Sequence, residues 1–428
     1  MASSFAHIAR GQAPARWSGL SACLLGGLAF LLSCFPLSAA GFGESLLESA
    51  RRPLRIPFSY VDGFIVVDIR LDGLVPVKFI FDTGSQHTIL TDPAFLRLIG
   101  RVPDQSIRIV GSDLSLAFEG ALVRRVGIEV GDVSIRSQPL IVIDDARLDL
   151  QAITGQAVYG ILGMRAFSAY ALTIDYAAEQ LTLTPNAPRI PRRGTEVLPL
   201  EVVEGKAYVT AAARVHPAYS DSLRLLLDTG ASLEMLMHAE RTDTLLYPPQ
   251  LVIGQIGYGL GGSLYGYVGR SDTLGLGPYA LPDIVTHFQT LDNDELRSEL
   301  APRRGIIGNR LLERFLVTID YPRSQLILRP TRRFRKRRAY DRSGLRLVSD
   351  GLNLEYVRVQ LVVEGSPAAA AGMKIGDRIL YINGAPVRLT SLEGCKRRLR
   401  RRPGKRIRLR IMRANQPVVV SFRLRELI

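Results

Sequence analysis

Short hydrophobic stretches, interrupted by glycine, proline and charged residues, recur from about residue 55 to residue 330. They are rich in Val, Ile and Tyr, a composition typical of β-strands. Clear examples are Phe64–Ile69, Leu140–Ile143 and Ala207–Thr210. Long amphipathic helices are scarce before residue 390. The pattern therefore predicts an all-β fold for most of the chain.

Four landmarks of this pattern occur twice, in the same order, at a shift of about 145 residues. They are Asp82, Gly163, Asp175 and the strand Gln180–Leu183 in the first copy, and Asp228, Gly308, Asp320 and Gln325–Leu328 in the second. The first interval is 81 positions in one copy and 80 in the other, and the second is 12 in both. Such a repeat predicts two fused lobes, residues 55–190 and 195–330.

Each copy begins with Asp-Thr-Gly behind an apolar run, so Asp82 and Asp228 occupy equivalent points of the repeat. Peptide hydrolysis by two carboxylates needs one ionised group to take a proton from water and one protonated group to polarise the carbonyl. Two carboxylates in one site share a proton, because ionising both is costly. We therefore interpret Asp82 and Asp228 as the catalytic pair.

The residues after each aspartate are interpreted as active-site support. They are Thr83, Gly84 and Ser85 in the first copy, and Thr229, Gly230 and Ala231 in the second. Glycine permits a tight turn and a close approach to substrate, and the two threonines are expected to hydrogen-bond across a pseudo-twofold axis. Because Ser85 is replaced by Ala231, the aspartates are expected to differ in support and in affinity for the shared proton.

These motifs resemble the clan of aspartic proteases that includes pepsins and retroviral proteases. The shared pattern is present in Ile80–Ser85 with Ile161–Gly163, and in Leu226–Ala231 with Ile306–Gly308. The resemblance spans about residues 55–330. It implies a two-lobed acid-protease β fold in which each apolar-apolar-Gly strand packs beside its aspartate loop. The chain is also similar to exported bacterial proteins that join such a protease to a C-terminal PDZ domain.

The flaps depart from the pepsin pattern. Pepsin-like enzymes carry a tyrosine in the first-lobe flap, whereas the corresponding segment Ile109–Leu114 has none. The second lobe has a glycine-rich stretch with Tyr258, Tyr265 and Tyr267. This stretch looks like a mobile aromatic flap, and a plain hairpin is the alternative.

Residues 342–428 resemble a bacterial PDZ domain, a small α+β barrel-like fold, in the segments Gly365–Ala369 and Ile382–Gly384. Ser366 is expected to cap a short helix. A capping box at Thr390–Glu393 predicts a second helix to about Arg402.

The resemblance to PDZ domains also implies a peptide-binding site. An extended peptide would join a sheet edge beside the second helix. The loop that receives its terminal carboxylate is expected near Gly344, Leu345, Arg346 and Leu347.

Charge is distributed very unevenly. Residues 331–428 contain 25 Lys and Arg against 7 Asp and Glu, a net +18, whereas the whole chain carries +15, which leaves −3 for residues 1–330. Residues 331–341 are interpreted as a basic linker. The cations of the second predicted helix suit a solvated surface, an acidic peptide or an anionic membrane surface. No recognition motif for nucleic acid accompanies them, so a nucleic-acid partner is not expected.

The first 40 residues have the pattern of a signal peptide. Arg10 and Arg16 precede an apolar stretch, and cleavage is expected after Ala40. Retention as a membrane anchor and lipidation at Cys34 are alternatives. The protein is therefore expected to be exported and to be periplasmic, envelope-anchored or secreted.

The remaining composition adds no metal or cofactor chemistry. Cys395 is the only cysteine after residue 40, so it cannot form an internal disulfide, and no Cys/His cluster has metal-ligand spacing. The sequence thus predicts an aspartic endopeptidase whose complete site can form within a monomer. It is expected to bind a polypeptide substrate between its lobes and a peptide or protein partner on its PDZ domain. A non-catalytic peptide-binding scaffold at the cell envelope is the alternative.

Overall fold

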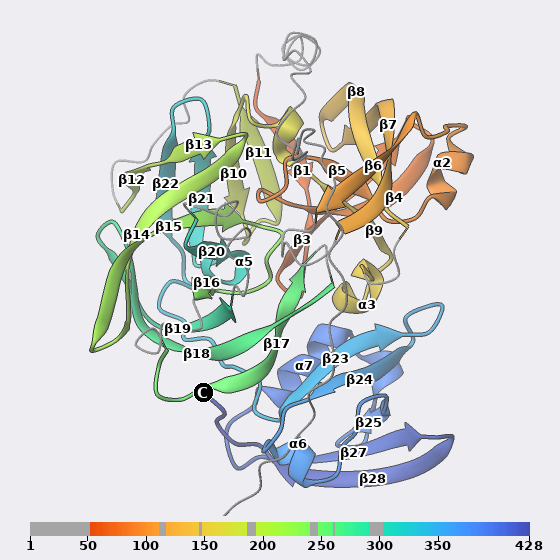
Figure 1. The fold of residues 1–428 in the computed structure, drawn as a ribbon, viewed down its shortest axis with the longest axis vertical. Helices are drawn as coiled ribbons and strands as arrows, with labels where there is room; N and C mark the ends of the chain where they lie inside the picture. Colours follow the sequence, from red (N-terminus) through yellow and green to blue (C-terminus); the bar gives the residue numbers. More distant parts are fainter. Residues whose placement is uncertain are drawn as a thin grey trace, which may run out of the picture. The chain divides into compact units, whose positions relative to one another are not determined.

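The computed structural model describes residues 52–110, 117–144, 148–185, 194–239, 247–259, 262–290 and 303–428. All of them fall within one unit, Ala39–Ile428 (Figure 1). The predicted signal peptide, residues 1–40, lies outside the described residues. None of the helices described is long and apolar enough to cross a membrane.

Each half of the repeat forms an eight-stranded sheet, and the strand order is the same in both. In lobe 1 the order is β2 (Ser59–Val61), β3 (Phe64–Leu71), β4 (Val75–Phe81), β9 (Val158–Leu162), β5 (Thr88–Leu90), β8 (Val133–Val142), β7 (Ala117–Val130) and β6 (Gln105–Val110). In lobe 2 it is β13 (Glu201–Val203), β14 (Lys206–His216), β15 (Tyr219–Asp228), β20 (Gly305–Gly308), β16 (Met235–Ala239), β19 (Tyr279–Thr290), β18 (Gly262–Leu276) and β17 (Val252–Gly259). The sequence repeat is therefore a repeat of one β fold.

A third sheet of six strands joins the halves. Its order is β1 (Leu54–Pro57), β11 (Gln180–Thr184), β10 (Ala171–Asp175), β21 (Phe315–Asp320), β22 (Gln325–Pro330) and β12 (Glu196–Pro199). At its centre Thr173 lies opposite Thr318, with their hydroxyl oxygens 2.8 Å apart. These two threonines are equivalent in the repeat, so a pseudo-twofold axis passes between them.

The strand that leads to Asp82 is held on both of its faces. Successive side chains of a strand point to opposite sides. Phe79 and Phe81 enter the main core, whereas Ile80 packs into a second cluster with Ile161. Burying each of these side chains stabilises the fold by roughly 1.5–3 kcal/mol. The start of the aspartate loop is consequently fixed by packing above and below.

The C-terminal domain is a sheet with two short helices. The sheet order is β23 (Leu345–Asp350), β24 (Tyr356–Val362), β25 (Arg378–Ile382), β27 (Arg406–Arg413) and β28 (Gln416–Arg423), with β26 (Ala385–Pro386) paired to β25. The Ser366 side chain accepts a hydrogen bond from the Ala369 amide, which confirms the predicted cap of helix α6 (Pro367–Ala370).

The prediction for the second helix was wrong at both ends. Helix α7 (Leu392–Leu399) is capped by Ser391, whose side chain accepts from the Gly394 amide. It stops before Arg400 instead of continuing to Arg402, where the arginine-rich turn carries little apolar surface to pack. Cys395 lies in the domain core, as expected of a packing residue.

The basic segment 331–341 packs on lobe 2. Arg333 and Arg338 form ion pairs with Glu313, and the Phe334 ring contacts Phe315 at a centroid distance of 5.3 Å. Its charges are thus partly paired with lobe 2 instead of being fully solvated.

Candidate active site

Asp82 leaves the end of β4, where the neighbouring strand β9 fixes the backbone. The two strands are parallel, with Phe81 opposite Leu162, and the Asp82 amide donates to the Leu162 carbonyl at 3.0 Å. Strand β9 also pairs with β5 on its other side. The apolar-apolar-Gly strand therefore lies beside the aspartate loop, in the arrangement that the resemblance implied.

Asp228 is placed in the same way in lobe 2. It ends β15 opposite Gly308 of the parallel strand β20, and β20 pairs on its other side with β16. A β-carbon at Gly308 would lie 2.6 Å from the Ala231 carbonyl oxygen. Glycine is required here because the aspartate loop passes directly over this strand.

The two loops are joined by four buried hydrogen bonds between Thr83 and Thr229 and their surroundings. Each threonine amide donates to the hydroxyl of the other, at 2.9 and 3.0 Å. Each hydroxyl in turn donates to a carbonyl of the opposite lobe, Leu227 or Phe81, at 2.8 Å. The predicted contact across the axis is present, and it is reciprocal.

Each carboxylate lies against the glycine of the opposite loop. A β-carbon at Gly84 would lie 2.6 Å from Asp228 Cγ, and one at Gly230 would lie 2.5 Å from Asp82 Cγ. The amides of Gly84 and Gly230 both donate to Asp82 Oδ1, at 2.7 and 3.1 Å. The structure thus brings the two predicted aspartates together across the lobe boundary, and no side chain larger than glycine fits at either point.

Burial and proximity give the two aspartates a high affinity for a proton. Burial, then the charge of Asp228 and hydrogen bonding with it, raise the pKa of Asp82 well above the usual range. Burial also raises the pKa of Asp228, against the opposing influence of Asp82, Arg303 and backbone amides. The pair therefore keeps one proton at pH values where an exposed aspartate is ionised.

The expected role of Ser85 is not the one that the structure shows. Its hydroxyl donates to the His87 carbonyl at 2.8 Å, so the Asp82 carboxylate is not its hydrogen-bond acceptor. The exchange of serine for alanine at position 231 consequently does not by itself distinguish the aspartates. A larger difference between the lobes lies behind the aspartate loops, at the residue that follows each glycine strand.

Asn309 supports the lobe 2 loop, and the sequence reasoning missed it. Its side-chain nitrogen donates to the Thr229 carbonyl, and its side-chain oxygen accepts from Tyr176 at 2.6 Å. The equivalent residue of lobe 1 is Met164, which offers no such groups. The Tyr321 hydroxyl, equivalent to that of Tyr176, is buried without a hydrogen-bond partner among the described residues. A comparison of the residues that follow Gly163 and Gly308 in the two copies would have shown this difference in the sequence.

Two cations lie within electrostatic reach of the aspartates. Burial lowers the pKa of Lys206, while Asp82 and Asp228 act in the opposite direction. Burial also lowers the pKa of Arg303, against the charge of Asp228. The Arg303 Nε donates to His238 Nε2 at 3.2 Å, which fixes its position. Within the described residues, no three His, Cys, Asp or Glu side chains come together as metal ligands would.

The flap candidates fall on hairpins. Strands β6 and β7 pair up to Val110 and Ala117, and the rest of the first-lobe candidate, residues 111–114, lies outside the described residues. In lobe 2, β17 and β18 pair up to Gly259 and Gly262. Tyr265 is exposed, whereas the Tyr267 ring packs on Tyr247 at a centroid distance of 5.1 Å.

The predicted carboxylate-binding residues of the C-terminal domain already have partners in the chain. The amides of Ser343 and Gly344 donate to Asp341 Oδ1, at 2.9 and 2.6 Å, and the Leu345 amide donates to the Ser343 hydroxyl. Leu345 and Leu347 are core residues of the domain. A peptide carboxylate would have to replace Asp341 to reach the amides of Ser343 and Gly344.

Comparisons with known proteins agree with both resemblances. Residues 67–166 match the family model of aspartyl proteases, and residues 358–413 match that of PDZ domains. The crystal structure of an aspartic proteinase from Irpex lacteus is similar to the chain with a TM-score of 0.40 and 14% identity, over 67% of this chain and 99% of that one. No curated protein matches the chain. The predictions of a mostly β fold and of a C-terminal PDZ domain are confirmed, and the aspartyl-protease match covers part of lobe 1.

Proposed function

We propose that the protein is an endopeptidase that hydrolyses peptide bonds with a water activated between Asp82 and Asp228. The observation that carries this proposal is the reciprocal contact of each carboxylate with the glycine of the opposite loop. A scaffold that only bound peptides would not require two buried carboxylates to face each other, because burying like charges is costly.

In the proposed reaction the ionised aspartate removes a proton from water, and the water oxygen attacks the scissile carbonyl carbon. The protonated aspartate donates its proton to the carbonyl oxygen, so that a neutral tetrahedral diol forms. When the diol collapses, one diol hydroxyl gives its proton to the ionised aspartate, the carbon–nitrogen bond breaks, and the amine nitrogen takes a proton from the other aspartate. The pair then again holds one proton, and no covalent intermediate is needed.

The direct test uses purified protein, an unfolded polypeptide substrate and two single variants. Asp82→Asn and Asp228→Asn should each lower kcat by about 10²–10⁴-fold, the usual contribution of a general acid or base. Asp68→Asn is the matched control, because Asp68 is exposed and pairs only with Lys78 among the described residues. Retained cleavage in either active-site variant would refute the assignment. A wild-type protein that binds peptides without cleaving them would instead be the scaffold.

We also propose that the PDZ domain recruits the substrate or a partner, since PDZ domains bind peptides at a sheet edge. Amidating the C-terminal carboxylate of a recruited protein substrate should raise its KM. An unchanged KM would contradict recruitment by the PDZ domain, and substrate recognition would then be assigned to the two lobes alone.

Export is proposed from the sequence of residues 1–40. Mass analysis of the mature protein from membrane and soluble fractions should give a chain that starts at Gly41. A diacylated Cys34 or an intact first residue would instead identify the lipidated or anchored form. We propose on the same basis, from the sequence, that an anionic membrane surface is a partner and that a monomer can form the complete site.

A further inference from the structure

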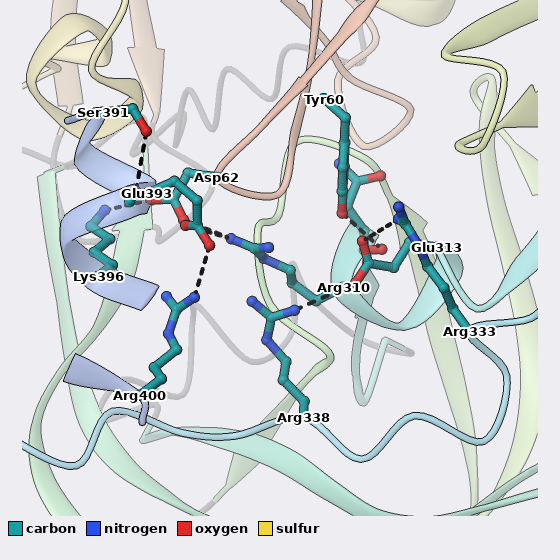
Figure 2. A network of polar contacts seen from close by, with 12 residues as sticks. Tyr60, Asp62, Arg310, Glu313, Arg333, Arg338, Ser391, Glu393, Lys396 and Arg400 are labelled. Carbon is teal, nitrogen blue, oxygen red and sulfur yellow. Dashed lines mark hydrogen bonds and ion pairs between the residues drawn. The ribbon is translucent and has the colours of Figure 1, made fainter. Parts of the chain in front are cut away.

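A buried cluster of charges joins three regions of the chain (Figure 2). Asp62 lies in the turn between β2 and β3 of lobe 1. Its Oδ1 accepts from Arg310 on helix α5 (Asn309–Leu312) of lobe 2 at 2.6 Å, and its Oδ2 pairs with Lys396 on helix α7 of the PDZ domain. Asp62 and Arg310 are only 7% and 9% exposed at their side chains. One carboxylate thus holds a cation from each of the other two regions.

Glu393 extends this cluster along the PDZ helix. Its Oε1 pairs with Arg400 at 3.1 Å, and its Oε2 lies 3.7 Å from Arg310 Nη2. The favourable charges of Lys396 and Arg310 outweigh burial and hold the pKa of Asp62 below its usual range. Figure 2 shows Asp62 and Arg310 facing the side of the helix that carries Glu393 and Lys396.

PDZ domains bind a peptide at a sheet edge beside a helix. Here the edge strand β23 packs with helix α7, and we call the expected peptide site between them the PDZ groove. Helix α3 (Leu150–Thr154) of lobe 1 lies against β23. It ends in Gly155, where a β-carbon would lie 3.0 Å from both Ser349 Oγ on β23 and Leu392 Cβ on α7. Lobe 1 therefore contacts both walls of the groove closely at this point.

The charge cluster also leads to the active-site loop. Arg310 directly follows Asn309, whose side chain donates to the Thr229 carbonyl. The amide of Asn309 donates to the Ala231 carbonyl at 2.9 Å, and the amide of Arg310 donates to the Leu233 carbonyl at 3.0 Å. One short helix therefore connects Arg310 with the loop that carries Asp228.

We propose that helix α3 with Gly155 is an internal ligand of the PDZ groove, locked by the Asp62–Lys396 ion pair, and that this docked state positions the Asp228 loop. A peptide that enters the groove competes with lobe 1, so groove occupancy by a peptide and full activity oppose each other. The coupling to activity rests on the proposed peptidase function, whereas the docking itself does not. Asn309 and Arg310 act in it as positioning residues.

The first experiment reverses the charge that locks the docked state. Lys396→Glu should lower kcat on a short peptide roughly 5-fold or more, the lower end of typical coupling between sites. It should also speed amide hydrogen exchange in residues 148–156 and 305–312. The matched control is Arg397→Glu on the same helix, where the side chain is exposed and the change in charge is identical. If the two variants behave alike, or if exchange in 305–312 is unchanged by Lys396→Glu, the coupling is refuted.

A second experiment keeps the proposal testable if Lys396→Glu does not fold. Lys396→Met retains the aliphatic stem and should give the same changes to a smaller extent. The paired substitutions Gly155→Cys and Ser349→Cys should form a disulfide on mild oxidation, whereas Gly155→Cys with Ser421→Cys on β28 should not. Failure of the first pair to form would refute the docking.

The crosslink also separates the docking from the proposed function. Oxidising the Gly155→Cys, Ser349→Cys pair in the Lys396→Met background should restore slow exchange in residues 305–312 and wild-type kcat. Absence of this rescue would refute the role of docking in positioning the loop. If the wild-type protein cleaves no peptide, the peptidase proposal fails, and the exchange measurements alone then decide the coupling.

Discussion

The two lobes share one strand order and one aspartate loop, yet they differ in the residues that follow the glycine strand. In lobe 1 the glycine strand is followed by Met164, a side chain with no polar group for the neighbouring loop. In lobe 2 it is followed by Asn309 and Arg310, which bind the Thr229 carbonyl and Asp62. The threonine and glycine that follow each aspartate are, in contrast, the same in both lobes. The residues behind the lobe 2 loop, Asn309 and Arg310, connect that loop to other parts of the chain.

The largest expected effect concerns the symmetric part, the aspartates themselves. Because the pKa of the pair is raised, activity should persist above the usual aspartate range and be lost as the pH rises through the raised pKa. The sign for stability is the same: the fold favours the protonated pair, so stability falls between the ordinary and the raised pKa. In Asp228→Asn the like charge is gone, and the pKa of Asp82 should fall towards the value set by burial.

Carboxyl ¹³C chemical shifts and a pH–rate profile measure these changes. A profile that follows an ordinary, exposed aspartate would contradict the shared proton. An Asp82 pKa that is unchanged in Asp228→Asn would show that the two groups do not interact.

The threonine contact tests the symmetry of the lobes. Thr83→Val and Thr229→Val each leave one amide and one carbonyl buried without a partner, which costs about 2–6 kcal/mol at 1–3 kcal/mol per group. The two losses of unfolding free energy, measured by denaturant titration, should be equal within about 1 kcal/mol. Thr173→Val is the control on the same axis, because it removes a single hydrogen bond and should cost only about 1 kcal/mol. Unequal losses of unfolding free energy in Thr83→Val and Thr229→Val would contradict an equal contribution of the two threonines to this contact.

The difference between the lobes can be tested at the turns that precede β3 in lobe 1 and β14 in lobe 2. Asp62 and Glu204 occupy equivalent positions, but Asp62 is buried between two cations and Glu204 is exposed. Asp62→Asn should cost about 3 kcal/mol, because it removes the counter-charge of Lys396 and the nearer of two counter-charges of Arg310. Glu204→Gln should stay within about 0.5 kcal/mol of the wild type. Thermal unfolding of both variants decides this, and equal shifts would contradict a special role for Asp62.

The smallest effect is expected at the two equivalent tyrosines. Tyr176→Phe removes the hydrogen bond to Asn309 and should cost about 1 kcal/mol. Tyr321→Phe should be neutral or slightly stabilising, since its buried hydroxyl has no partner among the described residues. A double-mutant cycle of Tyr176→Phe with Asn309→Met should show coupling, and additive effects would contradict the assigned contact.

Much of the candidate site could be predicted because its motifs are short segments of sequence and each occurs twice in the chain. The pairing of Thr83 with Thr229 follows from a repeat that puts identical residues on an axis, and the glycines follow from the close approach of two loops. The role of Asp62 could not be predicted, because its partner Lys396 is 334 positions away in a different domain. From the sequence alone, Asp62 is an ordinary turn residue before a glycine.

The PDZ domain shows the same limit. The cap at Ser366 depends on neighbouring residues and was predictable, whereas the occupation of the groove depends on where lobe 1 happens to dock. The basic run on helix α7 indicated solvent or an external anion. Its Lys396 is instead paired with Asp62 of lobe 1, a contact between regions that charge counting does not reveal. Arg400, which follows the helix, is paired with Glu393 in the same domain.

The threonine pair of the central sheet has a consequence for how such a chain can change over generations. At position 173 a residue meets its own copy, Thr318, with the two hydroxyl oxygens 2.8 Å apart. A hydroxyl can donate and accept at once, so threonine is complementary to itself, while a side chain that can only donate or only accept is not. After a duplication, most positions are free to diverge separately. A residue on the axis has inherited a partner identical to itself, and neither copy can be replaced well without the other.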